Sequence, residues 1–461
     1  MNISRVTGPH NLAFTTHNRV MRLSAMLLAA SCLLSAVSAQ WLETTIALPD
    51  SCQPGALCYN ATNNKVYCAN YASNVTVIDG ATNGVLSAVP VDSWPSILCW
   101  NPTVNRVYVA SSSGDRVNVI DGVLDSVIAT VAVGATPSAL CLNTLNNKVY
   151  CADQYGRRVT VIDGATNVII DTISVGDLPI ALYYNPQENK IYCANTGSNS
   201  VTVIHGATDS VLATIAVGDM PEPLCDNSLN NKIYCANCGD STLTVIDGAG
   251  NSAIATVTAG TEPGALCYNP TNNKVYCAIP GDSSVTVIDG ATDTVVTTVT
   301  VGVFPCVVSY NPTNNKVYVA NWWSNNVTVI DGATDSVIRT IAVGGGPCAF
   351  AHNPVQNRVY VANSESSSIS VLRDTAGGIE ERPKPQAASY KLAATIVRGV
   401  LVLGAVDSRQ NTACRAELLD IAGRKVRNLH PGASDVRALA PGVYFVRQAP
   451  AHVTNKVVIA R

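Results

Sequence analysis

The sequence predicts an all-β protein, in which a β-propeller of about eight four-stranded blades is followed by a small β-sandwich domain. Three observations lead to this prediction: a repeat of about 42 residues, four strand-like runs within each repeat, and a change of pattern after residue 373. Repeats of this length with four strands each are typical of propeller blades. The phrase Asn-[Lys/Arg]-[Val/Ile]-Tyr occurs once per repeat, and its tyrosines are Tyr67, Tyr108, Tyr150, Tyr192, Tyr234, Tyr276, Tyr318 and Tyr360.

One full repeat, residues 263–302, contains the runs ALCY, KVYCA, VTVID and TVVTTVTV. Val, Ile, Thr and Tyr dominate these runs, and Gly, Pro, Asn or Asp bounds each of them, which favours strands. We name the four strands a, b, c and d in chain order. The Asp-Gly pair after strand c indicates a tight turn, because glycine adopts positive φ at little cost.

The two ends of the repeat region predict how the ring closes. The segment ETTIAL (43–48) precedes the first a-b-c set, whereas the last set (349–373) has no strand d after it. We therefore expect the N-terminal strand to complete the last blade. This arrangement gives eight blades, and seven remain the alternative if one end unit packs elsewhere. Since a single blade cannot bury both of its faces, the repeated phrase is interpreted as scaffold, written once per blade.

The phrases on strands b and c resemble those of a known repeat family. YVAN stands at 318–321 and 360–363, YCAN stands at 67–70, 192–195 and 234–237, and a Val-x-Val-Ile-Asp run follows. These units are similar to the YVTN β-propeller repeat family, which is also found in surface-layer proteins. The resemblance covers residues 43–373, within a predicted propeller domain of 41–373. It implies a fold and says little about activity, because propellers host many functions.

Residues 1–40 are predicted to be an N-terminal extension and a signal peptide. The stretch 21–40 has a basic start at Arg22, an apolar middle, and small residues suited to cleavage at Val37, Ser38 and Ala39. Met21 is an alternative start to Met1. No other segment reaches membrane-spanning length, so we expect no transmembrane segment in the mature chain.

After a charged, Pro- and Gly-rich linker (374–389), residues 390–461 form a different domain. Its turn at 420–424, its LAPGVY phrase (439–444) and its closing strand (456–458) resemble the C-terminal sorting domain of type IX secretion. The resemblance implies type IX secretion machinery as a partner, and a secreted or outer cell-surface location. An ordinary adhesive β-domain is the alternative. The residues that carry the sorting signal would be Asp420, Gly423, Pro441, Gly442, Tyr444 and Lys456.

Composition narrows the classes of partner. Only 13% of residues are charged, the formal net charge is −3, and no basic run occurs, so nucleic acid is not expected as a partner. Cys235-x-x-Cys238 lacks a second half-site, so no metal or other cofactor is expected. Four repeats carry two cysteines ten residues apart on strands a and b, which predicts either buried thiols or cross-strand disulfides. These pairs are Cys58/Cys68, Cys141/Cys151, Cys225/Cys235 and Cys267/Cys277.

The connections that differ between repeats predict where binding occurs. The b–c loops and the d–a connections vary, whereas the a–b and c–d turns barely change. In a propeller the variable connections share one face, which we call the variable face, and binding sites tend to lie on such loops. Its aromatic side chains suggest a platform for a glycan or protein partner, or else they fill gaps between loops. The candidate binding residues are Tyr71, Trp94, Tyr155, Arg157, Arg158, Phe304, Trp322 and Trp323.

No catalytic residues are predicted. His205 replaces a turn aspartate and His352 stands beside an Asn-Pro turn, and there is no Ser-His-Asp signal or phosphate-binding loop. The leading hypothesis is therefore a secreted or cell-surface, non-enzymatic β-propeller that binds an extracellular protein or glycan through the variable face. The alternatives are an exported lyase or hydrolase that uses the same face, and a passive surface-layer structural protein.

Overall fold

The computed structural model describes residues 40–374 and seven strands between residues 394 and 459. These belong to two separate units, which divide at Glu380. The predicted signal peptide (except Gln40) and the predicted linker (except Asp374) lie outside the described residues.

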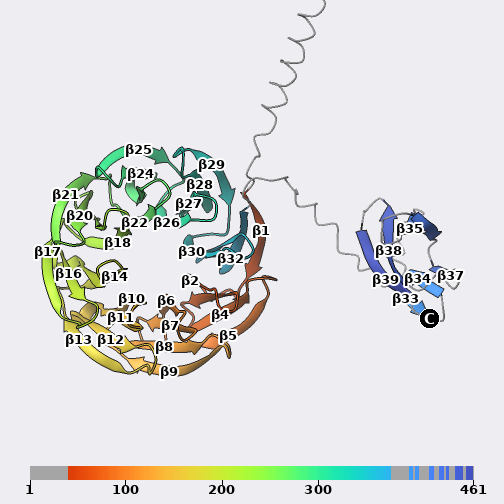
Figure 1. The fold of residues 1–461 in the computed structure, drawn as a ribbon, viewed down its shortest axis with the longest axis horizontal. Helices are drawn as coiled ribbons and strands as arrows, with labels where there is room; N and C mark the ends of the chain where they lie inside the picture. Colours follow the sequence, from red (N-terminus) through yellow and green to blue (C-terminus); the bar gives the residue numbers. More distant parts are fainter. Residues whose placement is uncertain are drawn as a thin grey trace, which may run out of the picture. The chain divides into compact units, whose positions relative to one another are not determined.

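The first unit is an eight-bladed β-propeller, which confirms the predicted fold class and blade number (Figure 1). Strand a lies nearest the centre of the ring and strand d lies at its circumference. Strands a are β2 (Pro54–Asn60), β6 (Pro95–Asn101), β10 (Pro137–Asn143), β14 (Pro179–Asn185), β18 (Pro221–Asn227), β22 (Ala265–Asn269), β26 (Pro305–Asn311) and β30 (Pro347–Asn353). Strands b are β3 (Lys65–Asn70), β7 (Arg106–Ser111), β11 (Lys148–Asp153), β15 (Lys190–Asn195), β19 (Lys232–Asn237), β23 (Lys274–Ile279), β27 (Lys316–Asn321) and β31 (Arg358–Asn363).

Strands b and c are almost fully buried, because each blade packs both of its faces against neighbouring blades. Three b–c loops contain a single 3₁₀ turn: η1 (Gln154–Gly156), η2 (Thr196–Ser198) and η3 (Pro280–Asp282). Strands c are β4 (Asn74–Asp79), β8 (Arg116–Asp121), β12 (Arg158–Asp163), β16 (Ser200–His205), β20 (Thr242–Asp247), β24 (Ser284–Asp289), β28 (Asn326–Asp331) and β32 (Ser368–Asp374). Strands d are β5 (Val85–Pro90), β9 (Ser126–Ala132), β13 (Ile169–Ser174), β17 (Val211–Ala216), β21 (Ser252–Thr258), β25 (Thr294–Thr300), β29 (Val337–Ala342) and β1 (Gln40–Ala47).

The N-terminal strand β1 closes the ring, as predicted. It pairs antiparallel with β32, from Gln40 opposite Asp374 to Ala47 opposite Ser368. An ion pair reinforces the seam, because the Arg358 guanidinium donates from Nη2 to Glu43 Oε1 (2.6 Å) and from Nε to Glu43 Oε2 (2.8 Å). Two parallel hydrogen bonds of this kind are among the stronger polar contacts in proteins.

The repeated Asn-Lys-Val-Tyr phrase joins each blade to the next. The Tyr67 hydroxyl is buried and donates to Asp125 Oδ1 in the following blade (2.9 Å), while Lys65 Nζ reaches Asp125 Oδ2 (2.7 Å). Burial and the carboxylate together raise the pKa of Tyr67. The same clamp recurs at Lys148 and Tyr150 with Asp209, Lys232 and Tyr234 with Asp293, and Lys274 and Tyr276 with Asp335.

The repeated turn aspartates hold the c–d turns, as predicted. Asp79 Oδ1 accepts the backbone N–H groups of Ala81 (2.7 Å) and Thr82 (2.9 Å), and these bonds lower the pKa of Asp79. In the fourth blade His205 Nδ1 takes over this role and accepts the N–H of Thr208 (3.3 Å). The interpretation of His205 as a turn residue is confirmed.

The cross-strand disulfides are wrong: the paired cysteines are free thiols, of which six are buried and two, Cys58 and Cys267, are partly buried. In β2 and β3, Cys58 lies opposite Tyr67, and Cys68 lies opposite Leu57. Because neighbouring residues of a strand point to opposite faces, a one-residue offset places the two thiols on opposite sides of the blade. The same register occurs in the three other pairs, and all fourteen cysteines of residues 40–374 are free.

We expect a reductant to leave the urea midpoint of unfolding unchanged, because no disulfide constrains the described residues. A thiol-reactive dye should label Cys68 and Cys235 only after unfolding, since both are fully buried. Spectroscopic unfolding curves with and without reductant check this. A lower midpoint under reducing conditions would contradict the free-thiol assignment.

The second unit contains two antiparallel sheets. Gly442 and Tyr444 lie in β38 and Lys456 lies in β39, whereas Asp420, Gly423 and Pro441 lie outside the described residues. One sheet comprises β33 (Ala394–Val397), β34 (Val400–Leu403) and β37 (Gly432–Asp435), and the other comprises β36 (Lys425–Leu429), β35 (Arg415–Leu419), β38 (Gly442–Ala449) and β39 (Val453–Ile459). Within the described parts of the chain, no helix is long and apolar enough to cross a membrane.

Candidate functional site

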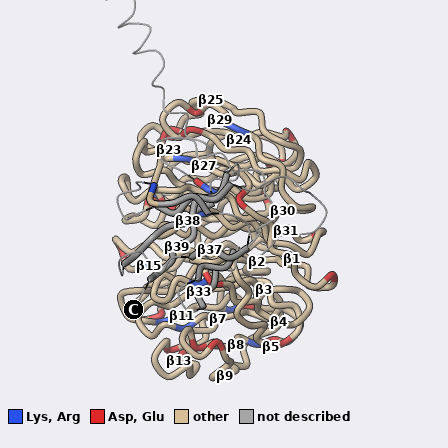
Figure 2. Tube along the Cα trace, turned by 90° about the vertical axis from the view of Figure 1, so that its right-hand side faces the viewer, with Lys and Arg blue, Asp and Glu red and all other residues tan. Residues whose placement is uncertain are grey.

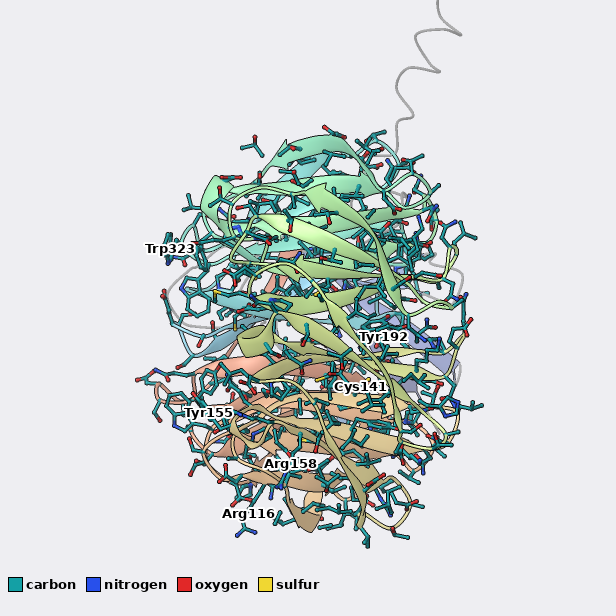
Figure 3. All side chains as sticks on the ribbon, turned by 90° about the vertical axis from the view of Figure 1, so that its left-hand side faces the viewer. Arg116, Cys141, Tyr155, Arg158, Tyr192 and Trp323 are labelled. Carbon is teal, nitrogen blue, oxygen red and sulfur yellow. The ribbon has the colours of Figure 1, made fainter. Side chains whose placement is uncertain are left out.

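The variable face is built by hydrogen bonds between the two kinds of variable connection. In each case a backbone N–H of a b–c loop donates to a carbonyl of the d–a connection in the same blade. Examples are Tyr71 N to Gln53 O (3.2 Å), Ser112 N to Trp94 O (3.0 Å) and Trp322 N to Phe304 O (2.9 Å). The predicted placement of these connections on one face is therefore confirmed. Tyr155 and Trp323 both project at the same side of the edge-on propeller (Figure 3).

The residue before the common proline has a left-handed backbone in every blade. Trp94 has φ 60° and Phe304 has φ 57°, a region that bulky residues normally avoid at a cost of about 1–2 kcal/mol. The carbonyl of this same residue accepts the loop hydrogen bond in most blades, so the hairpin holds the strained conformation. The chain thus places one residue at a constrained position in every blade, and this residue carries a side chain in all blades except the eighth. The eight residues are Gln53, Trp94, Thr136, Leu178, Met220, Glu262, Phe304 and Gly346.

A buried polar side chain at the end of strand b supports the b–c loop in every blade except the sixth, where strand b ends at Ile279. Asn70 Nδ2 donates to Thr76 Oγ1 (2.9 Å), and Asn321 Nδ2 donates to Thr328 Oγ1 (2.9 Å), with both asparagines fully buried. This bond links the Asn of the YVAN phrase to the Thr of strand c. The variable loops therefore stand on a hydrogen-bonded base that is repeated around the ring.

The first group of candidate residues lies at blades 1 and 2. The rings of Tyr71 and Trp94 are 5.3 Å apart between centroids and are tilted by 40°. Tyr71 is half-buried over Gly55, where a Cβ would meet its ring at 2.7 Å, while Trp94 is 56% exposed. Tyr71 therefore fills a gap, and Trp94 offers a ring to solvent.

The second group is Tyr155, Arg157 and Arg158 of blade 3, and the first two of these line a depression of about 310 Å³. Tyr155 is 67% exposed there, and Arg157 Nε is 3.2 Å from Asp177 Oδ1. Arg158 instead pairs with an internal residue: its Nε donates to the buried carboxylate of Asp153 (3.1 Å). Burial raises the pKa of Asp153, although Arg158 opposes this effect. Arg158 thus compensates an internal charge.

The third group lies at blade 7. Phe304 and Trp323 stack with centroids 4.4 Å apart and planes 26° apart, and Trp323 remains 66% exposed. Trp322 is half-buried, and its Nε1 donates to Glu365 Oε1 of blade 8 (3.0 Å). The stacked pair is thus a rigid apolar ledge beside a wider depression of about 590 Å³, whose lining includes Phe304.

The candidate residues fall into three groups of contacts on the variable face. Trp94, Tyr155 and Trp323 are solvent-exposed, whereas Tyr71, Phe304 and Trp322 also fill space between loops. Sequence reasoning missed two acidic residues, Glu222 and Glu262, which line the larger depression. Their positions beside the common proline could have placed them on the variable face, because Glu262 precedes this proline and Glu222 follows it in the preceding blade.

Within the described residues, histidine side chains lie outside the variable face. Both histidines of residues 40–374 lie at the ends of strands. His352 Nε2 is 2.7 Å from Ser309 Oγ, and burial lowers its pKa to about 4. The described residues contain no group of three or more His, Cys, Asp and Glu side chains suited to a metal ion.

Comparison with solved structures agrees with the architecture. The crystal structure of the computationally designed Ika8 protein resembles this chain with a TM-score of 0.60 at 16% sequence identity. The match covers 73% of this chain and 100% of the designed chain. No protein-family model and no curated protein matches the sequence. At this identity the likeness shows the fold alone, an eight-bladed propeller-like ring of four-stranded sheets.

Proposed function

We propose that the protein is a secreted or cell-surface, non-enzymatic β-propeller that binds an extracellular protein or glycan through the variable face. The observation that carries this proposal is the exposure of Trp94, Tyr155 and Trp323 on hydrogen-bonded loops. Large aromatic side chains contribute much of the binding energy at interfaces because they bury a large area with little loss of entropy. Charged residues are sparse along the propeller, so contacts through rings and backbone groups are favoured (Figure 2).

Export is the second part of the proposal. The basic and apolar stretch at 21–40 and the sorting-domain phrases of residues 390–461 support it. The C-terminal unit would act as the signal for type IX secretion machinery, and the propeller would be the cargo. The resemblance of the repeats to the YVTN family agrees with a surface location.

The proposal predicts that removing the indole rings of Trp94 and Trp323 weakens binding without unfolding the protein. The full chain is tested against envelope polysaccharides and secreted proteins of the source cell, alongside a Trp94→Ala/Trp323→Ala variant. We expect at least a tenfold loss of affinity in the variant, since each ring contributes about 1–2 kcal/mol at a well-packed contact.

The matched control is a Leu145→Ala/Leu229→Ala variant. These leucines are 71% and 68% exposed on a–b turns, which lie on the opposite face. Equal loss in both variants would indicate a general effect on surface apolarity. Binding that survives the tryptophan substitutions would place the site elsewhere.

A further inference from the structure

The two halves of the variable face differ in charge. Its only basic side chains are Arg116, Arg157 and Arg158, all in blades 2 and 3. Each lies close to an aspartate, at 3.9 Å for Arg116 and Asp92, 3.2 Å for Arg157 and 3.1 Å for Arg158. The b–c loops and d–a connections of blades 4 to 8 contain no Lys or Arg at all. Apart from Asp177, which pairs with Arg157, the acidic side chains of this half therefore have no local positive charge.

Most of these acidic groups are used to hold the loops. Asp240 Oδ2 accepts the N–H of Asp219 (2.8 Å), Asp282 Oδ2 accepts the N–H of Thr261 (2.9 Å), and Glu365 accepts from Trp322. Such bonds explain these carboxylates as structural groups. The explanation does not extend to the two glutamates of the larger depression.

Glu222 and Glu262 line the depression from neighbouring blades. In the described part of the chain neither forms an ion pair with a Lys or Arg. Met220, Pro280 and the ring of Phe304 supply an apolar wall around them. A cavity of about 590 Å³ that combines two carboxylates with a thioether and an aromatic ring suits an elongated group with an apolar stem and a cationic end.

A thiol in the same depression reports its electrostatic character. Cys238 Sγ donates to the carbonyl oxygen of Pro263 (2.8 Å). Burial raises the pKa of Cys238 to about 12, and the charge of Glu222, its side-chain hydrogen bond with the thiol and the charge of Glu262 add to this effect. The thiol is therefore kept neutral, mainly by burial and in addition by the two neighbouring carboxylates. A cation in the depression would relieve the same negative potential.

We propose that this depression receives a lysine or arginine side chain from a basic segment of a protein partner. The proposal rests on the proposed function and deepens it, because it selects a protein over a glycan. The cationic end lies between Glu222 and Glu262, the methylene stem contacts Met220 and Pro280, and the Phe304 ring adds a cation–π contact. A neutral sugar could donate hydroxyl groups to the carboxylates but would bring no counter-charge, and an anionic polysaccharide would be repelled.

The test uses the full chain and a short acetylated, amidated Gly/Ser peptide that carries arginine. Its affinity is measured by fluorescence anisotropy at low and physiological salt, beside the same peptide with citrulline in place of arginine. We expect Glu222→Gln and Glu262→Gln each to weaken binding of the arginine peptide about tenfold, since in each case the negative charge that strengthens the hydrogen bond is lost. The citrulline peptide should bind at least tenfold more weakly to the unaltered protein.

The control is Asp171→Asn, which removes one negative charge from the exposed outer strand β13 and leaves the depression unchanged. Equal weakening by Asp171→Asn and Glu262→Gln would show only general charge attraction and would overturn the proposal. No binding of the arginine peptide would overturn it too. If the tryptophan variant loses a natural glycan while both glutamine variants retain it, the proposed function holds and the cationic pocket is wrong.

Discussion

Replacing Asp374 by alanine is expected to lower the free energy of unfolding by about 3–5 kcal/mol. Its carboxylate is buried at the closing seam, where Oδ1 accepts from Lys316 Nζ (3.0 Å) and Gln40 Nε2 (3.2 Å), and Oδ2 accepts from Asn311 Nδ2 (2.7 Å). Without Asp374, the Lys316 ammonium is buried with no counter-charge, because its side chain is only 4% exposed. Urea unfolding followed by fluorescence measures the loss.

Asp125→Ala is the comparison for this substitution. It removes the equivalent clamp between blades 1 and 2, but the side chains of Lys65 and Asp125 are each 14% exposed. Water can therefore reach the freed ammonium, and we expect a smaller loss of about 1–2 kcal/mol. Losses of equal size in the two variants would show that the closing seam is no more sensitive to loss of a carboxylate than the interface between blades 1 and 2.

The second large effect concerns pH. Burial lowers the pKa of His352 from 6.5 to about 4, and the charge of Asp374 opposes this shift only in part. Between these two values the unfolded chain takes up a proton that the folded chain refuses, so stability falls as the pH falls. The shift corresponds to a loss of about 3 kcal/mol across that range. Unfolding curves at either end of the range measure it.

A His352→Tyr variant isolates this contribution. Tyrosine occupies the equivalent position of strand a in several other blades, as at Tyr59, Tyr268 and Tyr310, so the seam accommodates it. We expect the variant to lose most of the decline between the two pH values. The lowered pKa values of Glu43 and the turn aspartates belong to both proteins, and their losses appear at more acidic pH. An unchanged decline would exclude His352 as its source.

The fold was predictable because the same pattern of four strands and their turns recurs about every 42 residues. Eight tyrosine phrases fix the number of blades, and the missing last strand d fixes the closure by β1. The cysteine pairs show where spacing alone was insufficient. Asn60 lies opposite Lys65 across a four-residue a–b turn, so Cys58 meets Tyr67, and a spacing of ten places Cys68 on the other face.

The candidate site was predictable as a face, but its internal grouping was not. Loop variability identified the face, because the repeats provide an internal comparison. The roles of single residues depend on contacts between blades that a pattern does not reveal. Arg158 looked free in the sequence but neutralises Asp153, and Trp322 looked exposed but bonds Glu365. Glu262 was not predicted as a site residue, because the sequence does not show that Glu222 lines the same depression.

Because β1 pairs with β32, the propeller ring closes only when residues 368–374 are in place. The two strands are separated by more than 300 residues, so the entropy of bringing them together is lost in one late step. A chain still emerging from a ribosome holds β1 without its partner until residue 374 has appeared. A chain interrupted before β32 therefore remains an open arc with an unpaired strand edge at each end. Such edges promote aggregation and expose the chain to proteases.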